Sequence, residues 1–278
     1  MKKFENIILA SDVDGTFAYY GNPSSEKNVA ALRYFKENGG KFCFATGRNH
    51  IDINTVVKCD HRDIAGLPYV LCNGTYLYDF INNEIIDPIY LEPEHTVRLF
   101  CAIRAAFPHA GVRATTKKGF LAFDDNETVP AQLAKYGLAS MLYTVKAEDF
   151  TGEGVFKAVA SYDDFDTVEK IRRFVLENFG DTFSATRSTS KIVEILPRGI
   201  SKAYRLIKLR DNLKKQNPNI RLWCIGDFDN DIEMLSDADF SVCPANACDK
   251  VKAIAMHHVC HCDDGALAET VELIEKSL

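Results

Sequence analysis

Short apolar segments that stop abruptly at polar turns restrict the fold of this chain more than any other feature. Residues 7–10 are apolar, two of them β-branched, and they end at the acidic turn 12–16. Residues 41–45 form a second such segment, which ends at Thr46-Gly47-Arg48, and a helical apolar spacing separates the two. This β-α-β order is typical of parallel sheets, whose ligands bind beyond the carboxyl ends of the strands.

The same pattern returns near the C-terminus, whereas the middle of the chain is more mixed. We expect a strand around 191–196, a helix at 201–215 and a strand at 221–225. From about residue 82 the helix and strand patterns become more mixed, and the clearest helix in this part covers 163–179. The sequence therefore predicts an α/β protein with a Rossmann-like parallel-sheet core and an inserted α/β cap domain. The expected core is 1–81 with 191–278, and the expected cap is 82–190.

Composition excludes several classes of protein. The 278 residues are 46% hydrophobic and 26% charged, which is typical of a folded globular chain. Lys and Arg number 33 against 39 Asp and Glu, a net charge of -6, so nucleic acid is not an expected partner. The nine cysteines favour reduced thiols and a cytoplasmic location, and no apolar stretch approaches the roughly 20 residues that cross a membrane. The oligomeric state stays open.

Two groups of aspartates follow predicted strands. Asp12 and Asp14 are two residues apart, so in extended backbone both carboxylates address one point. Asp227, Asp229 and Asp231 follow the strand at 221–225. Parallel strands would bring both groups to one sheet edge, where oxygen ligands suit Mg²⁺. Each group alone also fits an ordinary acidic turn or an acidic helix N-terminus.

A calcium-loop interpretation of the second group fails. Such a loop needs glycine at its sixth position and glutamate at its twelfth, where this chain has Ile232 and Ala238.

Two further positions could bind an anion. Thr46, with Gly47 and Arg48 beside it, offers a hydroxyl and backbone N–H groups at a strand-to-helix turn, although an ordinary helix N-cap is the simpler explanation of this motif alone. Lys202 opens a helix, where a cation is electrostatically unfavourable unless acids or a phosphate lie nearby.

Taken together, these motifs resemble the haloacid dehalogenase superfamily, and specifically its Cof-like, sugar-phosphatase-like branch with a large α/β cap. The resemblance covers nearly the whole chain and includes four motifs in order and several flanking segments: 12–16, 46–48, 199–202, 226–231, Asn73-Gly74, 193–197, Asn246-Ala247 and Asp264-Gly265. The chain departs from the pattern at Thr75, Ala203 and Cys243-Pro244.

The resemblance implies a Mg²⁺-dependent phosphatase acting on small phosphorylated metabolites, most simply sugar phosphates. Asp12 would be the nucleophile that becomes an aspartyl-phosphate, and Asp14 the general acid and base. Mg²⁺ would be held by Asp12, the backbone carbonyl of Asp14 and Asp227, with Asp231 in support. Phosphate would be bound by the remaining motif residues: Thr46, Gly47, Arg48, Lys202 and Asn230.

The cap would set specificity. Its basic loop residues are candidates for substrate contact, but each equally fits a solvated surface: Arg113, Lys117, Lys118 and Arg187.

Other interpretations remain. A phosphomutase of the same superfamily would use the same acids, and a non-catalytic metabolite sensor could share the scaffold. Gly199-Ile200-Ser201-Lys202-Ala203 nearly matches a nucleophile elbow, which would make Ser201 the nucleophile of a serine hydrolase. The segment 257–262 suggests zinc, but four ligands in six residues lack the usual spacing, so we expect a strand with Val259 inward.

Overall fold

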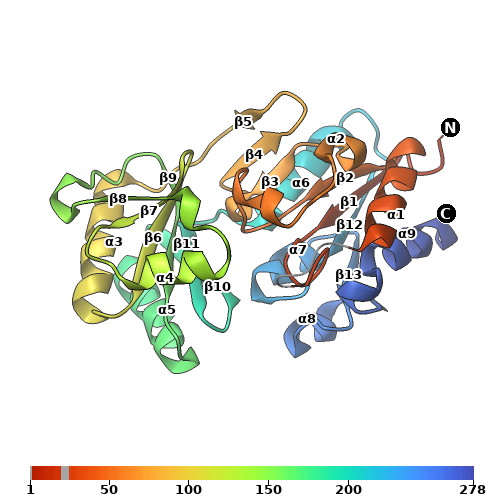
Figure 1. Ribbon diagram of the computed structural model, residues 1–278. Helices are drawn as coiled ribbons and strands as arrows, with labels where there is room; N and C mark the ends of the chain where they lie inside the picture. The colour runs from red at the N-terminus through yellow and green to blue at the C-terminus, as the bar shows by residue number, and fades with distance from the viewer. Residues whose placement is uncertain (1, 20–24) are drawn as a thin grey trace. The chain divides into compact units, whose positions relative to one another are not determined.

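A computed structural model describes residues 2–19 and 25–278 of the chain. The chain divides into two compact units (Figure 1). The first contains Met1–Ile86 and Ser201–Leu278, and the second contains Asp87–Ile200.

The first unit is built on a parallel sheet with the strand order β14-β13-β12-β1-β2. Its strands and helices are β1 (Ile7–Ser11), α1 (Glu26–Glu37), β2 (Lys41–Phe44), α2 (His61–Ile64), α6 (Lys202–Lys214), β12 (Arg221–Ile225), α7 (Ile232–Ser236), β13 (Phe240–Pro244), α8 (Asp249–Ile254), β14 (His257–Val259) and α9 (Ala266–Lys276).

Register explains why the polar turns meet at one edge of this sheet. Ser11, the last residue of β1, pairs with Ile225, the last residue of β12, and with Phe44, the last residue of β2. All five residues of β1 are buried, as expected for a central strand. The chain leaves β1 toward β2 on one side, while β12 lies on the other, and crevices at such a reversal of strand order are the usual ligand sites of α/β sheets.

A smaller antiparallel sheet completes the first unit. It contains β3 (Tyr69–Leu71), β4 (Tyr76–Asp79) and β5 (Glu84–Ile86). Strand β3 pairs with β4 in register and meets the parallel sheet through the bridge between Ala45 and Val70.

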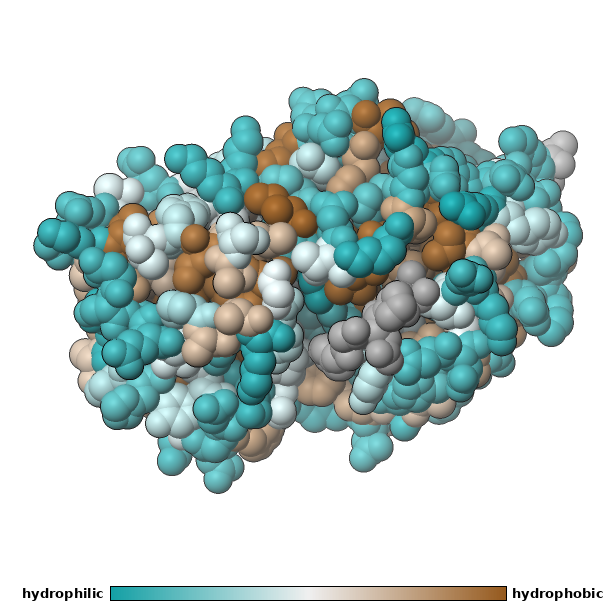
Figure 2. All heavy atoms as spheres, in the orientation of Figure 1, coloured by the Kyte–Doolittle hydropathy of each residue, from teal (hydrophilic) through white to brown (hydrophobic). Residues whose placement is uncertain are grey.

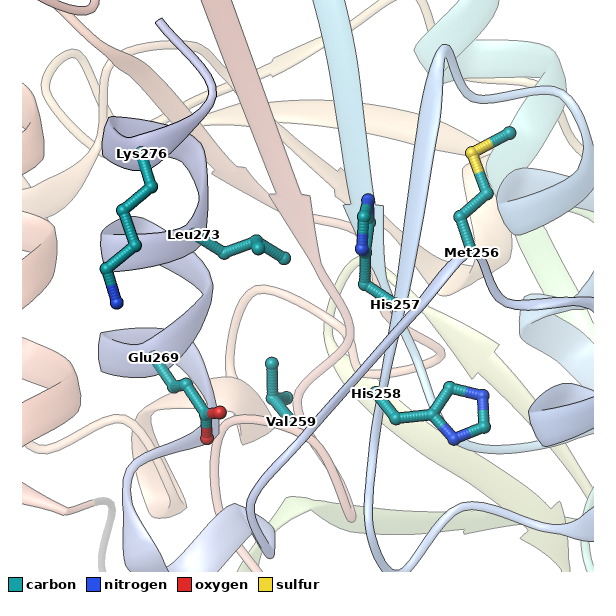
Figure 3. Close-up of a pocket in the computed structure, with 7 residues that line it drawn as sticks. All are labelled: Met256, His257, His258, Val259, Glu269, Leu273 and Lys276. Carbon is teal, nitrogen blue, oxygen red and sulfur yellow. The ribbon is translucent and has the colours of Figure 1, made fainter.

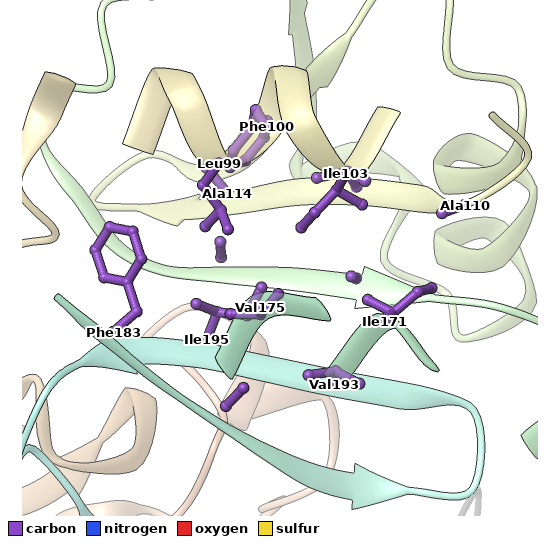
Figure 4. Close-up of a cluster of buried hydrophobic side chains, with 14 of the residues drawn as sticks. Leu99, Phe100, Ile103, Ala110, Ala114, Ile171, Val175, Phe183, Val193 and Ile195 are labelled. Carbon is purple, nitrogen blue, oxygen red and sulfur yellow. The ribbon is translucent and has the colours of Figure 1, made fainter. Parts of the chain in front are cut away.

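The second unit is a six-stranded sheet with the order β10-β11-β9-β6-β7-β8. Its strands and helices are α3 (Pro93–Ala106), β6 (Gly111–Thr116), β7 (Gly119–Phe123), α4 (Thr128–Lys135), β8 (Leu142–Val145), β9 (Val155–Ser161), α5 (Phe165–Phe179), β10 (Phe183–Thr189) and β11 (Ile192–Pro197). Alternate strand residues such as Ala114 and Ile195 face α3 and α5, which contribute Leu99, Phe100 and Ile171 to the same core (Figure 4). The α/β class with an inserted α/β unit is confirmed.

Both limits of the inserted unit differ from the predicted 82 and 190. At the first limit, β5 pairs with β4 and so stays in the first unit. At the second, β11 pairs with β9 and β10, so the strand expected to return to the core instead completes the second sheet. An apolar run shows that a strand forms, but it does not show which sheet the strand joins.

The tail segment forms the expected strand over only part of its length. His257, His258 and Val259 of β14 line a pocket together with residues of α9 (Figure 3). Val259 is buried as predicted. The strand ends there, and residues 260–264 turn into a short 3₁₀ helix, Cys262–Asp264.

The surface is mainly polar on the face seen in Figure 2, with apolar residues in scattered patches. Within the described ranges, no helix combines the length and apolarity that a membrane span requires. All nine cysteines carry free thiols.

Candidate active site

Asp12 lies directly beyond β1, an interior strand of the parallel sheet. Its backbone N–H donates to the carbonyl of Ile225 at 3.0 Å, which continues the ladder between β1 and β12 by one residue. The carboxylate is 5% exposed, and its Oδ1 accepts from Lys202 Nζ at 2.6 Å. A nucleophile at this position would be fixed by the backbone hydrogen bonds between β1 and β12.

Lys202 is the cation of the site. It is the first residue of α6, it is 1% exposed, and its Nζ donates to Oδ1 of Asp12 and, at 2.7 Å, to Oδ1 of Asp231. Burial would lower the pKa of Lys202, but attraction to these two carboxylates outweighs burial and raises the pKa. A lysine at the start of a helix is unfavourable unless acidic groups lie nearby, and Asp12 and Asp231 are such groups.

Asp227 and Asp231 come from the turn after β12, and their partners differ. Asp227 Oδ1 accepts from the hydroxyl of Thr16 at 3.0 Å. Both carboxylate oxygens of Asp231 accept hydrogen bonds within the protein. Oδ1 accepts from Lys202, and Oδ2 accepts from the backbone N–H groups of Asp227 and Phe228 at 2.9 and 3.1 Å. Asp231 therefore fits a supporting role better than direct metal ligation. Thr16 was given no role from the sequence, although it stands in the first motif.

The charge of this cluster fits a divalent cation. Asp12, Asp227 and Asp231 each bring a carboxylate oxygen within 4.8 Å of the others, and Lys202 supplies one compensating charge for the three. Burial, opposed by Lys202 and reinforced by Asp231, raises the pKa of Asp12 to about 7, and burial together with Asp12 raises the pKa of Asp227. An oxygen-only, buried donor set of this kind suits Mg²⁺.

Gly15 is required for the two motifs to approach each other. Its φ is +86°, and a Cβ built there would lie 2.3 Å from Oδ2 of Asp227. The Gly15 carbonyl accepts from Nδ2 of Asn246 at 2.7 Å, which fixes the turn from the other side. Any side chain at position 15 would displace Asp227.

Asp14 does not join the cluster through its carboxylate. Its oxygens accept from Nε and Nη2 of Arg48, each at 2.7 Å, in a bidentate pair. Arg48 Nη1 donates to the carbonyl of Asp52 and to the hydroxyl of Thr55, both at 3.2 Å. Each guanidinium nitrogen thus has a protein partner, and this arrangement does not support the predicted contact between Arg48 and phosphate.

Thr46 is buried at the end of β2, and part of its predicted anion site is already used. Its N–H donates to the carbonyl of Val70, and its Oγ1 accepts from the N–H of Arg48 at 3.2 Å. The backbone N–H groups of Thr46 and Arg48 already have acceptors within the protein. The hydroxyl of Thr46 is therefore the group that can donate to an anion. Phosphate contact by Gly47 stays a prediction.

The second acidic group is divided by its turn. Asp229 pairs with Lys250 at 3.3 Å and lies outside the carboxylate cluster, although the spacing had grouped it with Asp227 and Asp231. Asn230 is half-buried on the same turn, and its phosphate contact stays a prediction.

Ser201 has an ordinary structural role. Its side chain caps α6 by accepting from the N–H of Tyr204 at 3.1 Å, which accounts for the serine without a nucleophilic function.

Two of the proposed cap contacts have aromatic partners. Arg113 lies over the ring of Phe120 at 4.9 Å, and Arg187 lies over Phe165 at 4.8 Å. The other two candidates, Lys117 and Lys118, are exposed.

Comparison with known proteins identifies the family. Residues 9–271 match the family model of haloacid dehalogenase-like hydrolases. Pyridoxal phosphate phosphatase YbhA of Escherichia coli is 26% identical over 261 residues, covering 89% of this chain and 91% of that protein. The 5-amino-6-(5-phospho-D-ribitylamino)uracil phosphatase YwtE of Bacillus subtilis is 23% identical, covering 88% and 89%.

Solved structures share the fold. SMU.1108c of Streptococcus mutans superimposes with a TM-score of 0.82 at 20% identity, covering 96% of this chain and 97% of that one. BT4131, described as a subclass IIB sugar phosphatase of the superfamily, superimposes with a TM-score of 0.78 at 19% identity, covering 96% and 98%. With its family model, its phosphatase relatives and this site, the chain belongs to the haloacid dehalogenase-like hydrolases and is a phosphatase enzyme.

Proposed function

We propose that the protein is a Mg²⁺-dependent phosphatase that hydrolyses small phosphorylated metabolites, sugar phosphates among them, through a phosphorylated Asp12. The observation that carries the proposal is the buried cluster in which Lys202 bridges Asp12 and Asp231 beside Asp227. Carboxylates are known to form covalent phosphoryl intermediates, and a buried cation stabilises the charge of a transferring phosphoryl group.

In the first half of the reaction, an oxygen of Asp12 attacks phosphorus as the bond to the leaving alcohol breaks. Asp14 gives a proton to that alcohol oxygen. In the second half, Asp14 takes a proton from the water that attacks phosphorus, and the Asp12 carboxylate and inorganic phosphate are released. Lys202 and the hydroxyl of Thr46 bind phosphoryl oxygens throughout.

Asp12 and Asp227 are the residues that would hold Mg²⁺, with the backbone carbonyl of Asp14, and Asp231 would orient them through Lys202 and the turn amides. Bound there, the ion would neutralise phosphoryl charge. Its presence would also compensate the excess of carboxylates over Lys202, so binding is expected to stabilise the fold.

The inserted unit would select the substrate by contacting its leaving group, in line with the different substrates for which the two phosphatase relatives are named. We place the reaction in the cytoplasm, which the nine free thiols support.

Phosphate release over a panel of phosphorylated metabolites, with and without Mg²⁺, tests the proposal. We expect Mg²⁺-dependent release and its loss in Asp12→Asn, by at least about 10³-fold, because removal of a nucleophile leaves only binding and electrostatic contributions. Asp229→Asn is the matched control, since it makes the same substitution in the neighbouring turn after β12, outside the cluster.

The alternatives give different results in that assay. A phosphomutase would interconvert sugar phosphate isomers without releasing phosphate. A metabolite sensor would bind phosphorylated compounds and turn none over at saturating Mg²⁺. Near wild-type release by Asp12→Asn would refute the assigned nucleophile.

A further inference from the structure

A second group of ligand atoms lies where the tail leaves the sheet. The chain turns at the end of β14 into the 3₁₀ helix Cys262–Asp264, and this turn brings together one ligand atom each of His261, Cys262 and Asp263. The sequence argued against a metal here, because zinc ligands usually come as two pairs separated by a long loop and this segment has no such spacing. Tight winding brings three neighbouring residues together instead, and the third, Asp263, lies outside the segment 257–262.

The spacing of these atoms fits a tetrahedral ion. Sγ of Cys262 lies 3.7 Å from Nδ1 of His261, and Oδ2 of Asp263 lies 3.8 Å from the same nitrogen. The three donors all lie within 4.8 Å of one another. Zinc bonds of about 2.3 Å to sulfur and about 2.1 Å to nitrogen or oxygen place the first pair about 3.6 Å apart and the second about 3.4 Å apart. The two measured pairs therefore lie within a few tenths of an ångström of the separations that zinc requires.

The donor types select a different ion from that of the acidic cluster. Thiolate and imidazole prefer borderline or soft ions such as Zn²⁺, whereas the cluster around Asp12 offers only oxygen. Burial raises the pKa of the Cys262 thiol to about 12 in the absence of an ion, and a coordinated thiol loses its proton outright. The side chains of His261 and Asp263 are 36% and 39% exposed, so the site is next to solvent.

Neighbouring residues hold the site in place. The ring of Tyr19 lies 5.3 Å from that of His261. Cys262 N–H donates to Oδ1 of Asn246 at 3.1 Å, and the other end of the same amide donates to the carbonyl of Gly15. One local hydrogen bond competes with a bound ion, because Nδ1 of His261 accepts from the N–H of Asp263 at 3.2 Å. An ion would have to replace that bond.

We propose that His261, Cys262 and Asp263 form a second metal site, for a thiophilic divalent ion of the Zn²⁺ class with water as its fourth ligand. Binding forms the bond between sulfur and the ion and releases the thiol proton to solvent, with no change of oxidation state. Through Asn246, the ion would stiffen the backbone of Gly15, which packs against Asp227 of the acidic cluster.

Cobalt absorption tests the site in the full, reduced chain. Co²⁺ is added to metal-free protein in excess Mg²⁺, which occupies the acidic cluster. We expect a near-ultraviolet thiolate-to-cobalt charge-transfer band that saturates at one ion per chain and disappears on addition of equimolar Zn²⁺. A wild-type protein without this band at millimolar Co²⁺ would overturn the proposal.

Variants assign the band to these residues. It should vanish in Cys262→Ser and weaken at least about tenfold in apparent affinity in His261→Gln and Asp263→Asn, which carry the test if the buried cysteine variant does not fold. Cys260→Ser is the matched control and should keep the band, as should Asp227→Asn. A band that survives in His261→Gln and Asp263→Asn with unchanged affinity, or that is lost in Cys260→Ser, would contradict the assignment.

Discussion

Arg48 holds the one acid that the family resemblance assigns to proton transfer. Its two contacts with Asp14 use the planar fork of the guanidinium, which fixes a carboxylate in both position and rotation, whereas a lysine ammonium acts as a point charge. The carbonyl of Asp52 and the hydroxyl of Thr55 hold the guanidinium in turn. We therefore expect Arg48 to act through Asp14, as a positioning residue.

Replacing Arg48 by methionine should lower kcat by about 10²-fold, because general acid–base catalysis contributes about 10²–10⁴-fold and depends on orientation. Arg48→Lys should recover only part of the loss. The effect should be largest for alkyl phosphates and smallest for an aryl phosphate, whose acidic leaving group needs no proton. Steady-state kinetics on both substrate types measures the difference.

Arg62→Met is the control for this change, because Arg62 makes a comparable pair with Asp60 on the exposed surface. Its kinetics should match the wild type. If Arg48→Met slows both substrate types equally, Arg48 does not act through proton transfer.

His61 makes the stability of the first unit depend on pH. It is buried, its ring stacks on Phe80 with centroids 3.9 Å apart, and Nε2 donates to Oδ1 of Asn54 at 3.0 Å. Burial lowers the pKa of His61 from 6.5 to about 4. Because the folded pKa is the lower one, the unfolded chain takes up the proton first. The stabilisation is complete above about pH 6.5 and is lost as the pH falls toward about 4.

Urea denaturation at about pH 7.5 and about pH 5 checks this expectation. The wild type should lose about 2 kcal/mol more free energy of unfolding over this interval than His61→Gln, whose amide does not titrate. Equal losses in the two proteins would show that His61 is not a source of acid sensitivity.

Among the elements, a strained turn connects the two segments that carry Thr46 and Lys202. Cys72, Asn73 and Gly74 all have positive φ, at 48°, 54° and 96°. The N–H of Asn73 donates to the carbonyl of Thr46. On the other side, Arg205 of α6 is buried and donates from Nε to the carbonyl of Gly74 at 2.7 Å. Strain of this kind is kept where surrounding contacts over-determine it.

Gly74→Ala should lower the free energy of unfolding by at least about 2 kcal/mol and reduce activity, because its Cβ would lie 2.1 Å from the carbonyl oxygen of Ser201. Gly137→Ala is the matched control. It has a φ of +69° but no atom within 4 Å of the added Cβ, so only the backbone penalty applies. Chemical denaturation of both variants separates contact from backbone strain.

Across the molecule, both ends of the chain contribute to the site within one unit. Asp12 and Thr46 come from the N-terminal segment, whereas Lys202, Asp227 and Asp231 come from the C-terminal one. The inserted unit has its own sheet and its own apolar core, so we expect it to be a separate folding unit.

Two fragments test this division. Residues 87–200 should fold alone, because β11 completes the six-stranded sheet. Residues 82–190 lack β11, which pairs with both β9 and β10, so β10 would lose its only neighbour in that sheet. Amide dispersion in NMR spectra should be native-like for the first fragment and collapsed for the second. Equal dispersion would show that β11 is dispensable.

The fold class and the sheet edge that carries the chemistry follow from the order of residues alone. Strand periodicity, burial and polar turns are local properties, so they suffice to assign Asp12, Thr46 and Asp227 to strand ends. The order of the motifs then points to the family. These inferences need only neighbours along the chain.

Which side chains meet depends instead on how distant segments pack. Arg48 turns to Asp14, Asp229 turns away to Lys250, and β11 joins the inserted sheet, although the sequence had suggested otherwise in each case. The physical reason is that a charged side chain takes the direction of the oppositely charged partner that folding brings near it, and a strand joins the sheet that satisfies its backbone. Those partners lie far away in the sequence.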